Sequence, residues 1–287
     1  MVLCIPPTVL LNVLVLIGIY KTPSLHTPNN VLLWGLALTD LGVGVLAMPL
    51  FTVKYVAFYT KNHGLWCESL ALLTKVLQPP FCGISIATLT LISIDRVIAL
   101  KFHLRYASMV TTHHFTAALV IVWIMAFTIC LTYLINVNII HWSTVFIFGV
   151  CLIICSSNNT FILRTLHRHR VDIQRQHDQV QINVHSAEMA QRRKSSRNML
   201  WVYLMFIVCY VPFLAMRTAR NYNGTNTDML HAVYEISYAL TFLNSLINPV
   251  FYCIRMRRLR KAMLSWIPIT QSQFCWVCNR VKMEPNT

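Results

Sequence analysis

The sequence predicts an all-α membrane protein, a bundle of seven transmembrane helices followed by a short amphipathic helix. Of its 287 residues 56% are hydrophobic and 11% are charged, whereas a soluble domain has about a quarter of its residues charged. The apolar residues form seven blocks, each near the ~20 residues that a helix needs to cross ~30 Å of hydrocarbon. Alternating strand-length segments are absent, which disfavours a barrel. The blocks are 4–20, 31–53, 69–94, 115–135, 139–163, 199–216 and 230–254.

The first block lacks the positive region that begins a cleavable signal peptide, so we interpret it as a retained span. It is short, and Pro6 and Pro7 lie near its outer end. The long polar segment 167–198 contains no Pro or Gly, which predicts helical extensions of the fifth and sixth spans around a mobile middle.

After the last span, residues 255–266 alternate basic and apolar side chains, as in an amphipathic helix on the membrane surface. The sequence therefore divides into a transmembrane domain (1–254) and a cytoplasmic amphipathic helix with a tail (255–287).

Membrane topology explains the net charge of +15 better than nucleic-acid binding does. With the N-terminus outside and the C-terminus in the cytoplasm, 19 of the 24 Lys and Arg lie on the cytoplasmic side. Such an excess of positive charge orients membrane proteins. Basic tracts beside the inner leaflet also bind anionic lipid. The sequence predicts a multi-pass protein of the plasma membrane, with membrane lipid and no nucleic acid among its partners.

Most of the ten cysteines lie inside the predicted spans, where they serve as small hydrophobic residues. Cys275 and Cys278 form a CxxC pair in the tail. Without a second pair this is weak evidence for zinc, and lipid attachment or no function remain the alternatives.

Polar side chains within spans are costly in hydrocarbon and are therefore candidates for function. Asp40 lies in the middle of the second span and requires a cation, a proton or a set of donors. The other polar residues of this group are Asn12, Ser85, Asn244, Ser245 and Asn248. Each taken singly could simply hydrogen-bond a neighbouring helix.

Motifs in consecutive spans resemble those of the rhodopsin-like (class A) G-protein-coupled receptors. They are "LNVLV" with Asn12, "LALTDL" with Asp40, "SIDRVIAL" with Asp95 and Arg96, Trp123, "FIVCYVP" with Pro212, and "NSLINPVFY". The likeness covers essentially the whole chain, with one signature per helix. It implies a receptor that transmits an extracellular ligand signal to a heterotrimeric G protein, and not an enzyme.

The resemblance implies that Asp40, Ser85, Asn244, Ser245 and Asn248 enclose a sodium ion and waters. It also implies that Pro249 loosens the seventh helix and that Tyr252 points into the cavity that then opens. Phe206, Tyr210 and Pro212 would form the corresponding hinge in the sixth span. A possible structural Na⁺ is thus the one cofactor expected.

By the same resemblance, Asp95 holds Arg96 at rest and releases it toward the G protein, and Leu104 presses into that partner. Simple snorkelling of Arg96 to the interface is the alternative. The chain has no acidic residue from 189 to 227 that could lock Arg96 across helices. We therefore expect appreciable basal activity.

Several positions depart from the family pattern. Cys67 lies 28 residues before Asp95, and the second outer loop, expected at 136–142, contains no cysteine, so the usual disulfide is expected to be absent. Asn159 stands where a signalling tyrosine is expected, and Tyr210 replaces the usual tryptophan. The fifth span lacks its usual proline. The short outer loop, the missing disulfide and the missing proline of the fifth span together resemble the melanocortin, adenosine, cannabinoid and lysophospholipid receptors.

The ligand class follows from exclusion. Gln78 stands where amine receptors carry aspartate, which disfavours a biogenic amine, and the seventh span has no lysine for retinal. Asn223 is part of a glycosylation sequon in the loop before the last span. The residues expected to line the outer ligand pocket are Lys75, Gln78, Phe213, Arg217, Glu235 and Tyr238.

Other protein classes fit less well. A transporter or channel would need a charged path, and beyond Asp40 the inner two-thirds of the spans carry almost no charge. An intramembrane enzyme would need a nucleophile or metal motif, and none occurs. A receptor relic that does not signal is left open by Val97, Asn159 and Tyr210.

Overall fold

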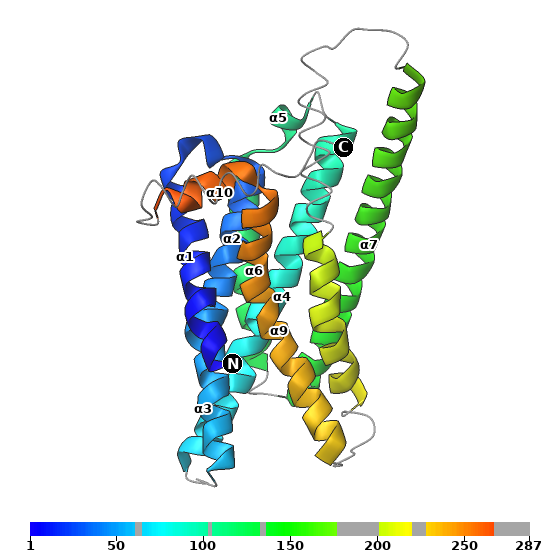
Figure 1. Ribbon diagram of the computed structural model, residues 1–287. Coiled ribbons are helices and arrows are strands. Elements are labelled where there is room, and N and C mark those ends of the chain that lie inside the picture. The colour runs from blue at the N-terminus through cyan, green and yellow to red at the C-terminus, as the bar shows by residue number, and fades with distance from the viewer. Residues whose placement is uncertain (61–64, 103–104, 133–135, 177–200, 220–227, 267–287) are drawn as a thin grey trace.

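The computed structural model describes residues 1–60, 65–102, 105–132, 136–176, 201–219 and 228–266. All regular elements in these ranges are helical, and the long helices run side by side in one bundle (Figure 1). The predicted all-α bundle is confirmed. The helices are η1 (Val2–Cys4), α1 (Ile5–Lys21), η2 (Pro23–Leu25), α2 (Pro28–Gly42), η3 (Val43–Ala47), α3 (Met48–Tyr59), α4 (Leu65–Lys101), α5 (Tyr106–Met109), α6 (Thr112–Leu131), α7 (Val137–Gln176), the helix Trp201–Ala219, α9 (Asp228–Arg255) and α10 (Arg257–Leu264).

Six of the described helices are long and apolar enough to cross a membrane: Val2–Lys21, Pro28–Ala57, Leu72–Lys101, Thr112–Leu131, His141–Thr165 and Trp201–Ala219. The seventh, α9, has 28 residues and therefore a length of about 42 Å at 1.5 Å per residue. Its hydropathy is lower because Asn244, Ser245 and Asn248 interrupt its apolar sequence. These are the polar residues that the sequence nominates for function.

Large apolar side chains on the outer faces of the helices are exposed in the structure. Leu10, Ile124, Phe146 and Ile153 each have more than half of their surface uncovered. A soluble protein seldom exposes contiguous apolar patches of this kind. In this bundle they form the surface that contacts lipid tails.

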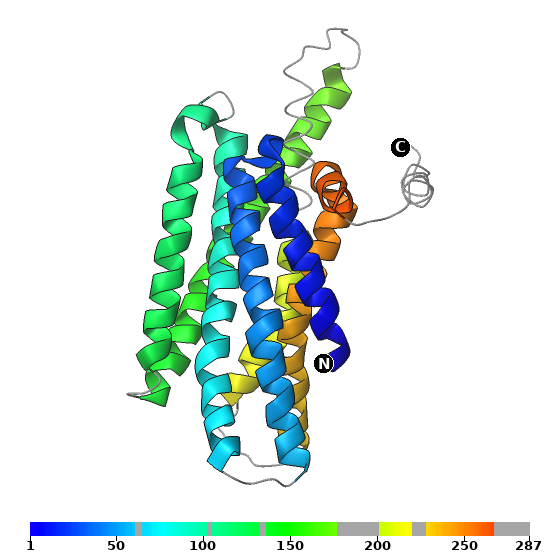
Figure 2. The ribbon, with the colours of Figure 1, turned by 90° about the vertical axis from the view of Figure 1, so that its left-hand side faces the viewer.

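One end of the bundle carries α5, α10 and the extension of α7 beyond its neighbours (Figures 1 and 2). The helix predicted after the last span is α10, whose Leu259, Ala262 and Met263 are buried. Its backbone approaches α1 at Gly18, where an added Cβ would lie 3.3 Å from the Met263 nitrogen. A larger side chain at position 18 would push α10 away.

Two loop predictions are tested by α7. The extension of the fifth span is confirmed, because α7 runs to Gln176. The second outer loop was placed too far along the chain, because residues 137–142 are already helical in α7. The apolar sequence of this stretch continues the pattern of the fifth span, so the helix begins earlier than expected. The extension expected before the sixth span, and the mobile middle, lie outside the described residues.

Two consecutive prolines, Pro79 and Pro80, lie inside α4 without ending it. Proline has no N–H, so Pro80 cannot donate to the carbonyl four residues earlier, which belongs to Val76. The thiol of Cys130 on α6 donates to this carbonyl instead. A side chain of the neighbouring helix thus replaces a missing backbone donor.

Replacing Cys130 with alanine is therefore expected to destabilise the protein by about 1 kcal/mol, because a partly buried carbonyl loses its donor. Cys130→Ser keeps a donor and is expected to recover much of the loss. Thermal unfolding in nanodiscs measures both. Cys209 provides a matched control, since it is buried and has no hydrogen bond to any residue that the structure describes. At Cys209 serine should be worse than alanine, and the same order at Cys130 would contradict the proposed bond.

Candidate functional site

Asp40 and Asn248 meet in the centre of the bundle. Asp40 is on α2, Asn248 is on α9, and both are almost fully buried. The Asn248 side-chain amide donates to the Asp40 carboxylate, with Nδ2 2.8 Å from Oδ2. Asp40 thus faces the seventh span and not the lipid.

Asn12 on α1 joins the same region through a second bond to α9. Pro249 has no N–H, so the carbonyl of Ser245, four residues earlier, lacks its helical donor. The Asn12 amide donates to this carbonyl at 3.0 Å and to the carbonyl of Thr8 at 2.9 Å. The amide of the first span therefore compensates for the proline of the last.

Several oxygen and nitrogen atoms of this region have no protein partner among the described residues. Such buried groups are costly unless water or an ion satisfies them. No group of three or more His, Cys, Asp or Glu that could hold a metal occurs in the described parts of the chain. One carboxylate with hydroxyl and amide oxygens instead suits water or a hard cation of low charge. The unsatisfied side chains are Asn12 (Oδ1), Asp40 (Oδ1), Ser85, Thr88, Asn244 and Tyr252.

The second span changes its winding directly after Asp40. Residues Val43–Ala47 form a π-helical turn, η3, between α2 and α3. Such turns are rare and are frequent at functional sites. Nothing in the apolar sequence "VGVLA" predicts this turn.

Arg96 and Asp95 form an ion pair near the C-terminal end of α4. Both residues are buried, and the Tyr106 hydroxyl donates to the other carboxylate oxygen of Asp95 at 2.5 Å. Tyr106 belongs to α5, so the short loop helix is tied to the ion pair. Sequence reasoning did not identify Tyr106, although it directly follows the "KFHLR" segment.

A small cavity lies beside Arg96 and is lined in part by Asn159 and Tyr203. Asn159 is buried, and its Nδ2 has no partner among the described residues. Tyr203 bonds across to Ser156 on α7, with their oxygens 2.7 Å apart. Polar groups from α7 and from the helix Trp201–Ala219 thus line the cavity beside the arginine.

The predicted hinge residues differ in their surroundings. Phe206 and Tyr210 are buried and stacked, with ring centroids 4.1 Å apart. Phe148 of α7 packs against both rings. Pro212 is exposed, whereas Pro249 is buried within α9.

Two of the predicted ligand-pocket residues, Phe213 and Tyr238, lie in an aromatic cluster. The ring of Tyr238 lies 5.2 Å from Phe213 and 5.0 Å from Phe51. The Arg217 guanidinium lies 5.9 Å from the Phe213 ring centroid. Gln78 is buried, and its Oε1 has no partner among the described residues, while Glu235 is half-buried.

Other predicted positions lie outside the described residues: Leu104, Asn223, Cys275 and Cys278. Cys67 and Lys75 are on α4, but their side chains are not described. The structure therefore does not test the expected absence of the disulfide.

Comparison with known proteins places the chain beside receptors. The model of the 7 transmembrane receptor (rhodopsin family) matches residues 11–143 and 135–252. The chain is 25% identical to 5-hydroxytryptamine receptor 1D of Homo sapiens, over 92% of this chain and 86% of that receptor. It is 24% identical to adenosine receptor A2b of Mus musculus, over 87% and 82%. For adenosine receptor A3 of Ovis aries the identity is 23%, over 96% and 89%.

Proposed function

This chain belongs to the rhodopsin family of seven-transmembrane receptors, and we propose that it passes the signal of an extracellular ligand to a heterotrimeric G protein. The Asp40–Asn248 bond is the observation that carries the proposal, because it joins the second and seventh spans through buried polar groups. A core with unsatisfied polar atoms can exchange partners, whereas a dry, close-packed core cannot do so easily. The bundle therefore contains an element with two arrangements.

Sodium is the proposed ion of this element. Asp40, Ser85 and Asn244 would hold it, because each has a buried oxygen without a protein partner among the described residues. The ion would supply a positive charge beside the carboxylate. Asn248 and Asn12 keep α9 against α2 and α1. Pro249 and Tyr252 are the proposed points where the inner end of α9 moves.

The Arg96–Asp95 pair is the proposed contact point for the G protein. In the present arrangement Asp95 holds Arg96 within the bundle. Release of the arginine would present a cation near the C-terminal end of α4, and Leu104 is the proposed apolar contact with the G protein. We place this end in the cytoplasm, because most of the basic residues lie on this side.

The proposed ligand site is the aromatic cluster at the opposite end, around Phe213 and Tyr238. Flat rings favour an aromatic ligand. Serotonin and adenosine, the ligands that the relatives are named for, both contain such rings. Gln78 offers an amide where a carboxylate would pair an ammonium group. We therefore propose an aromatic ligand that is recognised by hydrogen bonds to Gln78, Arg217 and Glu235.

Nucleotide exchange on purified G proteins tests the function. The helix Trp201–Ala219 has no acidic residue that could lock Arg96 from the sixth span. We therefore expect the receptor in nanodiscs to accelerate exchange without ligand, and we expect Arg96→Ala to abolish this acceleration. Thermal unfolding of both proteins checks that the variant is folded. Exchange that persists in a folded Arg96→Ala variant would rule out the proposed role, and absence of exchange with every G-protein class and ligand would indicate a receptor relic.

A further inference from the structure

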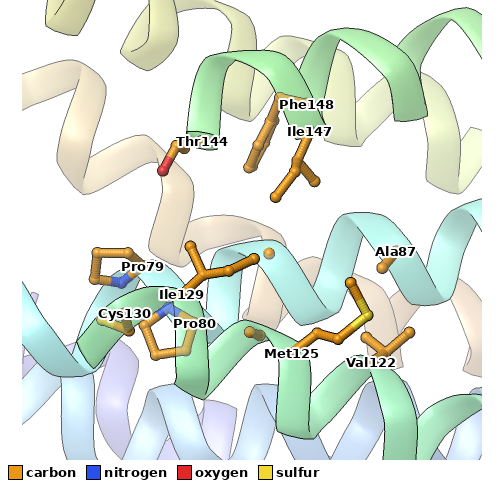
Figure 3. Close-up of a pocket in the computed structure, with 12 residues that line it drawn as sticks. Pro79, Pro80, Ala87, Val122, Met125, Ile129, Cys130, Thr144, Ile147 and Phe148 are labelled. Atoms are coloured by element: carbon orange, nitrogen blue, oxygen red, sulfur yellow. The ribbon is translucent and has the colours of Figure 1, made fainter. Parts of the chain in front are cut away.

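A cavity of about 150 Å³ lies between α4, α6 and α7 (Figure 3). Its lining is apolar except for the Thr144 hydroxyl and the Cys130 thiol. The thiol is already engaged with the Val76 carbonyl. An apolar cavity of about this size stays dry and can take up a molecule such as benzene. The cavity therefore suits a hydrocarbon group and does not suit water.

The mouth of the cavity faces the region of lipid tails. Most of the span Thr112–Leu131 faces outward, since only 17% of its most apolar 18-residue stretch is buried within the protein. Met125, which lines the cavity, has 56% of its surface exposed on the outer face of this span. The surrounding medium at this depth is the bilayer interior. A chain end of a membrane lipid can enter directly from it, whereas the fused rings of a sterol exceed this volume.

The inner wall of the cavity connects it to the proposed hinge. Phe148 points from α7 toward the cavity (Figure 3). Its ring centroid lies 6.1 Å from that of Phe206 and 5.8 Å from that of Tyr210. An occupant would therefore press on a ring that packs against both Phe206 and Tyr210 of the helix Trp201–Ala219.

We propose that this cavity is a lipid-facing regulatory site, occupied by the end of a lipid acyl chain that holds Phe148 against Phe206 and Tyr210. Occupancy stabilises the present arrangement of the helix Trp201–Ala219, in which Asp95 holds Arg96. The regulatory part of this proposal rests on the proposed function, whereas the binding part does not. The two parts therefore need separate measurements.

Gly83 and Gly149 provide a matched pair of variants. An added Cβ at either glycine meets no atom within 4 Å. Gly83 lines the cavity and Gly149 does not. In Gly83→Leu the new side chain fills the cavity without displacing the backbone. Gly149→Leu makes the same change in helix propensity on α7 and leaves the cavity open to lipid.

The binding experiment uses nanodiscs of phosphatidylcholine with a diazirine near the end of one acyl chain. After illumination, mass spectrometry should locate label at Cys130, which lines the cavity and is buried from the bulk lipid, in the wild type and in Gly149→Leu. In Gly83→Leu this label should fall about tenfold, because the leucine excludes several methylene groups from an apolar site. Equal labelling of Cys130 in all three proteins, or no label at Cys130 in the wild type, overturns the site. Labelling by a diazirine sterol in place of the acyl probe overturns the choice of an acyl chain.

Nucleotide exchange without ligand tests the regulatory part. Gly83→Leu mimics a permanent occupant and should lower basal exchange by about two- to fivefold, while Gly149→Leu should match the wild type. Loss of label without a change in exchange overturns regulation and leaves the binding site standing. If the wild type shows no exchange at all, the proposed function fails, and the regulatory part fails with it. The labelling experiment then still decides whether the binding site exists.

Discussion

Replacing Asp95 with asparagine is expected to raise nucleotide exchange without ligand by about tenfold or more. Asp95 pairs with Arg96 in a buried position and also accepts a bond from Tyr106. A hydrogen bond to a charged group contributes about 1.5–3 kcal/mol, and each 1.4 kcal/mol is tenfold in an equilibrium constant. Asparagine keeps the size of the side chain and removes its charge. The equilibrium should then shift toward the arrangement with Arg96 released.

Asp95→Glu is the matched control, since it keeps the carboxylate and changes only its reach. Its basal exchange should stay close to that of the wild type. Exchange should be measured at equal amounts of folded receptor, because the loss of the Asp95 carboxylate beside a buried Arg96 lowers stability as well. If Asp95→Asn is folded and exchanges no faster than the wild type, the pair does not restrain the receptor.

Sodium is expected to suppress basal exchange by about tenfold in the wild type. The reason is that an ion that binds the resting arrangement more tightly than the active one shifts the equilibrium toward rest. The comparison replaces sodium chloride by choline chloride at equal ionic strength, so that general screening is constant. Asp40→Asn removes the charge from a buried side chain whose Oδ1 has no protein partner among the described residues. The dependence on sodium should disappear in this variant.

Thr39→Val controls for changes to the packing of α2. Thr39 is buried beside Asp40, but its hydroxyl is satisfied by the Gly35 carbonyl of its own helix at 2.9 Å. This variant should keep the sodium dependence. A wild type that is indifferent to sodium would remove the ion from the proposed switch, and a sodium effect that survives in Asp40→Asn would move the ion elsewhere.

Much of the fold and part of the candidate site are predictable from sequence. The spans follow from hydropathy, and Asp40, Asn12 and Asn248 stand out because polar groups are rare in hydrocarbon. The direct bond between Asp40 and Asn248 agrees with the common site inferred from the resemblance. Ser85 and Asn244 are also buried, but neither side chain forms a hydrogen bond to Asp40 within the described residues.

The remaining features depend on which faces of the helices meet. A proline shows that a carbonyl lacks its donor, but the sequence does not reveal that Cys130 supplies one to Val76. Tyr106 reaches Asp95 only because α5 folds back to the bundle. The π turn Val43–Ala47 and the cavity at Gly83 arise from packing, which an apolar sequence does not specify.

The bond from Asn12 to the Ser245 carbonyl has a consequence for biosynthesis. It joins the first span to the last. When spans enter the bilayer in order of synthesis, the Asn12 amide cannot bond to the Ser245 carbonyl until all the intervening helices have been made. A nascent chain that lacks α9 leaves this amide without its acceptor on α9, and one that lacks α1 leaves the Ser245 carbonyl without the amide. These two groups therefore find each other only after both terminal spans are in the membrane, so closure of the bundle is one of the last steps of its assembly.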